Sequence, residues 1–152
     1  MYLATLFIHS WLRYVVLGFG IWLLVVAFRG MRARELWTRT HDRVYVRFLA
    51  ALDTQLLLGL LLYFVLSPLS KAALANMGAA MKIAPLRFFG VEHIFTMLIA
   101  IIVAHVGRVR AKRKPEATRY RTVFVFQLVW LLLTLAAIPW PGLDIGRPLF
   151  RM

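Results

Sequence analysis

The sequence predicts an all-α integral membrane protein, a four-helix bundle with its N- and C-termini on the outer, periplasmic side. Two observations predict the fold class: the 152 residues are 62% hydrophobic and 16% charged, and the apolar residues fall in long runs without an amphipathic period. A third observation, the concentration of arginine and lysine in alternate connections, predicts the orientation. No repeat or linker divides the chain, so residues 1–152 are expected to form a single transmembrane domain.

Four apolar runs are each close to the roughly 20 residues that a helix needs to cross a bilayer. They lie at about 3–28, 48–66, 88–106 and 122–138. Arginine, lysine or proline bounds each run, as expected where a helix leaves the hydrocarbon. No small-residue cleavage site follows the first run, so we expect it to be retained as a helix and not removed as a signal peptide.

Basic residues divide the connections into two classes. The connections after the first and third runs carry most of them: Arg29, Arg32, Arg34, Arg39, Arg43, Arg47, Arg108, Arg110, Lys112, Arg113, Lys114, Arg119 and Arg121. The second connection and the C-terminal tail carry few: Lys71, Lys82, Arg87, Arg147 and Arg151. The positive-inside rule therefore places the first and third connections in the cytoplasm. Confined to such short segments, the net charge of +13 indicates contact with lipid headgroups and no nucleic-acid partner.

The second connection, residues 67–87, is the only long one. Apolar residues recur in it at near-helical spacing, which predicts a short helix lying on the outer surface: Leu69, Ala73, Met77, Ala80 and Met81. In the tail, prolines at 139, 141 and 148 are expected to end the fourth helix, and Trp140 suits the membrane interface.

Ionisable and strongly polar side chains inside the spans are costly and are therefore the candidate functional residues. They are His9 and Arg13 in the first run, Asp53 and Gln55 in the second, and Glu92, His93 and His105 in the third; the fourth has only Gln127 and Thr134. The chain has no cysteine, which excludes disulfides, thiolate metal sites and cysteine nucleophiles. A hydrolytic centre has no support either, because His9 and Ser10 are adjacent on a helix and do not face each other.

Depth and helical phase decide which candidates can meet. His9 and Arg13 share one face of the first helix, in its outer half, at the depth of Glu92 and His93. We expect Glu92 and His93 to face into the bundle, with Arg13 and Glu92 as a buried ion pair.

The other two ionisable residues lie deeper. His105 is turned roughly 120° away from His93 and is expected to anchor at the cytoplasmic edge, reaching toward the headgroups. Asp53 has no cation at its own depth, so it is expected to reach Arg47, to line a water-filled crevice or to be neutral.

Inward histidines on two helices of a bundle suit a b-type haem held by two imidazoles. Two haems would need histidines nearly whole turns apart on one helix, and the 12 residues between His93 and His105 do not meet this condition. At most one haem therefore fits, with His9 and His93 as iron ligands on the outer side. A quinone in a polar pocket at His9, Arg13, Glu92 and His93 is the other cofactor that these residues allow. Hydrogen bonds to the backbone or to Glu92 would explain the same histidines without a cofactor.

The segments HSWLRYVVL, QLLLGLLLYF, LRFFGVEHIFTMLIAI, AHVGRVRAKR and AIPWP together resemble small four-helix bacterial membrane proteins labelled cytochrome b-like. The resemblance covers nearly the whole chain, and its most specific part is RFFGVEH. It implies a multi-pass protein of the bacterial cytoplasmic membrane, with haem and electron transfer. This chain departs from the pattern at Asp53, where such proteins often have histidine.

Three functions follow as hypotheses. The first is a redox subunit that binds one haem b or a quinone near the outer face and takes part in electron transfer; a single outer site cannot carry electrons across the membrane, so an autonomous enzyme is not expected. The second is a cofactor-free accessory subunit of a larger membrane complex. The third is a small transporter or proton conductor using Asp53 and Glu92, which would lack the broken helices and repeats common in transporters.

Overall fold

A computed structural model describes residues 1–148 of the chain and shows an all-helical bundle. The long helices are α1 (Tyr2–Ala33), α2 (Arg39–Leu61), α6 (His93–Lys112) and α7 (Glu116–Ala136). Two π-helical turns, η1 (Leu62–Leu66) and η2 (Phe88–Glu92), continue α2 and precede α6. Three short helices lie between them: α3 (Pro68–Ala75), α4 (Met77–Ala80) and α5 (Ala84–Arg87).

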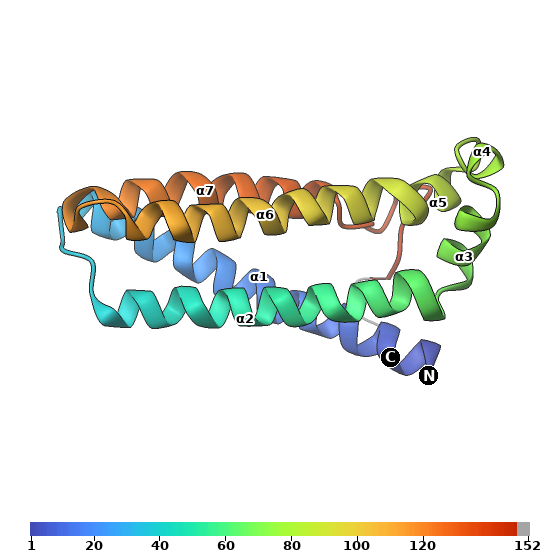
Figure 1. The fold of residues 1–152 in the computed structure, drawn as a ribbon, viewed down its shortest axis with the longest axis horizontal. Helices are drawn as coiled ribbons and strands as arrows, with labels where there is room; N and C mark the ends of the chain where they lie inside the picture. The colour runs from blue at the N-terminus through green and yellow to red at the C-terminus, as the bar shows by residue number, and fades with distance from the viewer. Residues whose placement is uncertain (149–152) are drawn as a thin grey trace.

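The short helices α3–α5 and the N-terminus lie at one end of the bundle, which we call the capped end (Figure 1). The connections after α1 and α6, together with the arginine-rich helix ends that flank them, lie at the opposite end, which we call the basic end. The structure thus has several short helices where the sequence predicted one. Arg151, counted above among the basic residues of the tail, lies outside the described residues.

Four helical segments in residues 1–148 are long and apolar enough to cross a membrane: Tyr2–Ala33, Arg39–Leu66, Ala84–Lys112 and Glu116–Ala136. They contain most of each predicted run and extend beyond it, chiefly at the basic end. The predicted bounds followed the apolar residues, whereas arginine and lysine are good helix formers and let the backbone stay helical past the apolar stretch. The expected all-helical fold with four long apolar helices is confirmed.

Local sequence explains where the helices begin and end. Thr38 begins α2 with a capping box, in which its hydroxyl accepts from the His41 backbone N–H and the His41 ring contacts the Thr38 backbone N–H. At the capped end, Ser67 accepts from the Ser70 backbone N–H, and Pro68 occupies the first turn of α3. These caps fix the angle at which each chain segment enters its helix.

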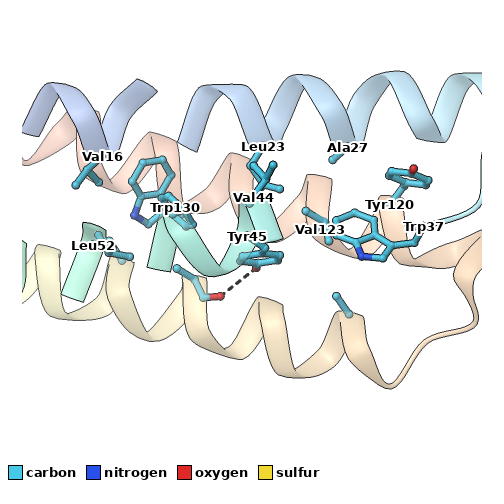
Figure 2. Close-up of a cluster of buried hydrophobic side chains, with 14 residues drawn as sticks. Val16, Leu23, Ala27, Trp37, Val44, Tyr45, Leu52, Tyr120, Val123 and Trp130 are labelled. Carbon is cyan, nitrogen blue, oxygen red and sulfur yellow. Dashed lines mark hydrogen bonds between the residues drawn. The ribbon is translucent and has the colours of Figure 1, made fainter. Parts of the chain in front are cut away.

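The helices pack unevenly. The interface between α6 and α7 is the most extensive, and α1 packs against both α2 and α7, while α2 and α6 meet at few positions. Figure 2 shows the buried cluster, which includes Trp130 of α7. The Trp130 ring meets Phe48 of α2 edge-on, with 4.7 Å between the ring centroids. The Tyr45 hydroxyl donates to the Ala104 carbonyl at 3.1 Å and so joins α2 to α6 through the cluster.

Close approach of α1 to α7 depends on glycine. A Cβ at Gly20 would lie 2.1 Å from the Trp130 ring, and one at Gly30 would lie 2.4 Å from the Tyr120 ring. On α6, the small residues Ala100 and Ala104 lie on the face that carries His93 and are almost completely buried. Small residues therefore set the spacing of the bundle on two of its helices.

Replacing Gly20 with alanine should lower the stability of the bundle. The added methyl group meets the rigid Trp130 ring, and such overpacking costs about 1–3 kcal/mol. The measurement is thermal unfolding of the detergent-solubilised protein. Gly18→Ala is the matched control, because a Cβ at Gly18 meets nothing within 4 Å and alanine favours the helix. Equal melting temperatures of the two variants would contradict this account of the α1–α7 contact.

Candidate functional site

A cavity of about 170 Å³ lies at the capped end, between α1, α2 with η1, α6 and α7. Its walls are mostly apolar, and they include Leu52, Leu56, Met97 and Ile101. The segment after α7 turns back across this end of the bundle (Figure 1), and Arg147 and Pro148 also line the cavity. The Arg147 guanidinium lies 5.1 Å from the centre of the Phe89 ring, which holds the tail beside η2.

The polar groups of this cavity are its distinguishing feature. Five buried side-chain polar atoms in residues 1–148 have no hydrogen-bond partner, and four of their residues line this cavity. The four atoms are His9 Nδ1, Gln55 Oε1, Trp130 Nε1 and Thr134 Oγ1. Buried polar atoms are nearly always paired, because an unpaired one costs about 1–3 kcal/mol. Because four of these residues surround one cavity, it is the candidate ligand site among residues 1–148.

Gln55 determines which ring nitrogen of His9 carries the proton. Its amide nitrogen donates to the His9 carbonyl oxygen at 2.9 Å and lies 3.3 Å from His9 Nε2. Because the amide donates, Nε2 accepts, and the ring proton of a neutral His9 is then on Nδ1. The buried, unpaired Nδ1 is therefore a hydrogen-bond donor. Gly59 lies against the same ring, where a Cβ would be 3.3 Å from Cε1.

The His93 ring is held by a hydrogen bond to the backbone at the end of α7. Its Nδ1 donates to the Ala137 carbonyl at 2.8 Å, at the end of α7, so the lone pair of a neutral ring is on Nε2. The ring packs beside Phe88 and Phe89 of η2. His93 lines the cavity together with His9 and Arg13, and the structure thus brings together three of the four residues predicted for a cofactor site.

Both π-helical turns lie at this cavity. In η1 the Ser67 N–H donates to the Leu62 carbonyl five residues earlier, at 2.8 Å, and the Tyr63 hydroxyl of η1 donates to the Gly90 carbonyl of η2 at 2.7 Å. A Cβ at Gly90 would lie 2.5 Å from Ala73 Cβ, so glycine lets α3 rest on η2. Such turns are frequent at functional sites, and here they direct Tyr63 and His93 toward the cavity.

The predicted inward position of Glu92 is wrong. Its carboxylate accepts from Arg87 Nε at 2.7 Å on the surface, and Glu92 is not part of the cavity wall. Residues 92 and 93 point about 100° apart on a helix, so both cannot face inward. The π-helical turn brings residues five apart onto one face, which explains why Arg87 and not Arg13 pairs with Glu92.

Asp53 and His105 form a pair that the sequence did not predict. His105 Nε2 lies 2.8 Å from Asp53 Oδ1, so the two residues pair across the α2–α6 seam. Asp53 forms no ion pair with Arg47. The expectations that His105 reaches toward the headgroups, and that Asp53 lines a water-filled crevice or is neutral, stay predictions. Sequence reasoning had placed both in the inner half of the membrane but had no means to see that α2 and α6 are neighbours there. The other expectation for His105, that it shares no wall with His93, is confirmed.

Sequence reasoning missed Trp130 as a site residue and gave no role to Gln127 or Thr134. Residues 127, 130 and 134 recur at helical spacing, and a polar or amphipathic side chain at each position was a usable signal. Gln127 donates to the Gly20 carbonyl at 3.2 Å, deep in the α1–α7 contact. Trp130 and Thr134 lie one and two turns further along, where that contact opens into the cavity.

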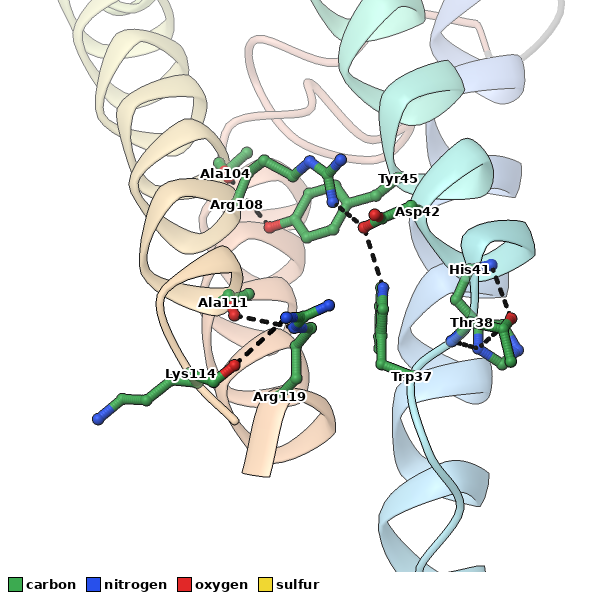
Figure 3. Close-up of polar contacts among 10 residues, drawn as sticks. All are labelled: Trp37, Thr38, His41, Asp42, Tyr45, Ala104, Arg108, Ala111, Lys114 and Arg119. Atoms are coloured by element: carbon green, nitrogen blue, oxygen red, sulfur yellow. Dashed lines mark hydrogen bonds and ion pairs between the residues drawn. The ribbon is translucent and has the colours of Figure 1, made fainter. Parts of the chain in front are cut away.

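A second polar cluster closes the basic end (Figure 3). Asp42 accepts from Arg108 and, at 2.9 Å, from the Trp37 indole N–H, so it joins α2 to α6 and to the connection after α1. Tyr120 of α7 extends the cluster, because its hydroxyl donates to the Leu36 carbonyl at 3.2 Å and lies 2.9 Å from His41 Nδ1. The cluster therefore holds the connection between α1 and α2 against the other helices.

Comparisons of the chain with protein families, curated proteins and solved structures found no match. In residues 1–148, no group of three or more histidine, aspartate, glutamate or cysteine residues gathers to hold a metal ion. The roles predicted for His9, Arg13, Glu92 and His93 in cofactor binding stay predictions.

The Arg108–Asp42 and Arg87–Glu92 ion pairs should differ in their contribution to the stability of the protein. The Arg108 side chain is 11% exposed and that of Asp42 36%, against 40% for Arg87 and 47% for Glu92. Asp42→Ala should cost about 1.5–3 kcal/mol, since it leaves a buried guanidinium and the Trp37 N–H unpaired. Glu92→Ala should cost less than about 1 kcal/mol. Thermal unfolding in detergent measures both, and similar losses would refute the contrast.

Proposed function

We propose that the chain is a multi-pass protein of the bacterial cytoplasmic membrane that binds a lipid-soluble quinone in the cavity at its capped end. The observation that carries this proposal is the set of unpaired polar atoms around one apolar cavity. By the positive-inside rule the capped end is the outer side. A quinone there would reach the site from the outer leaflet.

The polarity of the unpaired groups matches this ligand class. The His9 Nδ1–H, the Trp130 indole N–H and the Thr134 hydroxyl are donors, and each suits a quinone carbonyl oxygen. Gln55 Oε1 is an acceptor and suits the hydroxyl of the reduced form. The leucine, isoleucine and methionine walls suit the ring, because small-molecule sites are mainly apolar with a few placed polar groups.

The same geometry supports haem less well. Ligation by two imidazoles needs an unprotonated nitrogen on each ring facing the iron. His93 meets this condition at Nε2, held in place by the Ala137 carbonyl as in many metal-ligating histidines. His9 does not, because Gln55 faces its Nε2 and the proton is on Nδ1. We therefore assign the cavity to a quinone and derive no step through haem.

A bound quinone would supply two-electron redox chemistry at the outer face, which agrees with the electron-transfer role implied by the cytochrome b-like resemblance. The chain's own residues then bind the ring, orient its oxygens and keep water out. A single site near the outer face cannot carry electrons across the membrane, so the chain would act as a subunit beside a protein that accepts or donates the electrons.

Thr134→Val should weaken quinone binding without loss of stability. The Thr134 hydroxyl is buried and unpaired, so removing it costs the folded protein nothing, while the quinone loses one hydrogen bond of about 1 kcal/mol, roughly fivefold in affinity. The measurement is titration with a short-chain ubiquinone or menaquinone, followed by quenching of tryptophan fluorescence. Thr54→Val, which alters an exposed threonine of α2, is the matched control.

Two further results decide between the hypotheses. Organic extraction of the protein purified in mild detergent should release quinone, and its absorption spectrum should lack a Soret band. A Soret band that disappears in His93→Ala but persists in His105→Ala would replace the quinone by haem. If neither cofactor copurifies and no quinone binds, the proposal is wrong and the accessory-subunit hypothesis stands.

A further inference from the structure

A shallow groove lies at the basic end, at the opposite end of the bundle from the cavity. It runs between α6 and α7, has a volume of about 520 Å³ and is open to the surroundings. Its lining is entirely basic or uncharged: Arg110, Arg113, Lys114, Arg121, Thr122, Val125 and Phe126. None of its residues belongs to the quinone site proposed above, so this groove raises a separate question of ligand.

The cations of the groove are available to a ligand. The ion pairs found in residues 1–148 involve none of Arg110, Arg113, Lys114 and Arg121. Arg119, in the first turn of α7, behaves differently, because its guanidinium donates to the Ala111 and Lys114 carbonyls and closes the turn between α6 and α7 (Figure 3). The chain thus uses one arginine for structure here and leaves the four basic side chains of the groove facing outward.

The groove also has an apolar wall. The Arg110 guanidinium lies 5.6 Å from the centre of the Phe126 ring, which keeps it beside the groove. Toward the C-terminus of α7, Val129 and Leu132 follow Val125 on the exposed face at helical spacing. A ligand with an anionic head and an apolar tail would therefore meet cations at its head and an apolar stripe along its tail.

We propose that this groove binds the headgroup of an anionic phospholipid, with its phosphates held by Arg113, Lys114 and Arg121 and an acyl chain along α7. Arginine is suited to this role because its planar guanidinium donates two parallel hydrogen bonds to phosphate. Phospholipid fits better than free phosphate because the groove opens directly onto the apolar stripe. The site differs from general attraction to an anionic surface, since it is confined to the α6–α7 side of the basic end.

The test compares two charge-matched double variants of the full chain. Arg113→Gln with Arg121→Gln removes two cations from the groove, and Arg43→Gln with Arg47→Gln removes two exposed cations of α2 that do not line it. Cardiolipin is titrated into each detergent-solubilised protein, and binding is measured by native mass spectrometry and by the lipid-induced rise in Tm. Phosphatidylcholine and inorganic pyrophosphate are titrated in parallel.

If the groove binds the lipid headgroup, the affinity of the groove variant for cardiolipin should fall about tenfold to thirtyfold, and that of the α2 variant should equal the wild-type affinity. Phosphatidylcholine should not raise the Tm. Without lipid the three proteins should melt alike, because these side chains are exposed. Equal weakening in both variants would mean diffuse attraction and overturn the proposal. Pyrophosphate binding as tightly as cardiolipin would make the groove a site for soluble phosphates and also overturn it.

Discussion

The contact between α1 and α7 at Gly20 is the constraint on which the rest of the bundle depends. Because Gly20 has no side chain, the Trp130 ring lies directly against the α1 backbone, and Gln127 donates to the Gly20 carbonyl one turn away. Trp130 is completely buried there (Figure 2), and its ring meets Phe48 of α2 edge-on. Its indole N–H is left unpaired at the floor of the cavity. One close approach therefore packs three helices and supplies a donor to the candidate site.

The seam between α2 and α6 is held in a different way. These helices share little packing, but side-chain hydrogen bonds or ion pairs join them along the bundle at Arg108–Asp42, Tyr45–Ala104 and His105–Asp53. At the capped end, Tyr63 and Gly90 continue the series through the two π-helical turns. Between helices in lipid, polar contacts and close packing replace the hydrophobic effect as the source of association. Because these contacts join α2 and α6 without close packing between the two helices, room remains between them for the cavity.

The two ends of the bundle are chemically distinct, and the difference has a physical basis. At the basic end, Arg108 and Arg119 belong to polar clusters, whereas the cations of the α6–α7 groove face outward. At the capped end, short helices and the returning tail cover polar groups that remain unpaired within the bundle. Exposed cations can contact anionic lipid headgroups. Buried polar groups without a partner suit a ligand that has hydrogen-bond donors and acceptors of its own.

The sequence by itself determined the all-helical architecture, because four long apolar runs can satisfy their backbone hydrogen bonds in lipid only as helices. It also placed His9, Arg13 and His93 on the walls of one cavity, since these residues lie in regular α-helix. It failed at Glu92, where a π-helical turn changes that period, and at Asp53 and His105, whose pairing depends on which helices are neighbours. Only the tertiary structure decided these points, together with the unpaired atoms of Gln55, Trp130 and Thr134. A hydrogen bond that is missing in a folded core is a property of the packing around it and not of any local stretch of sequence.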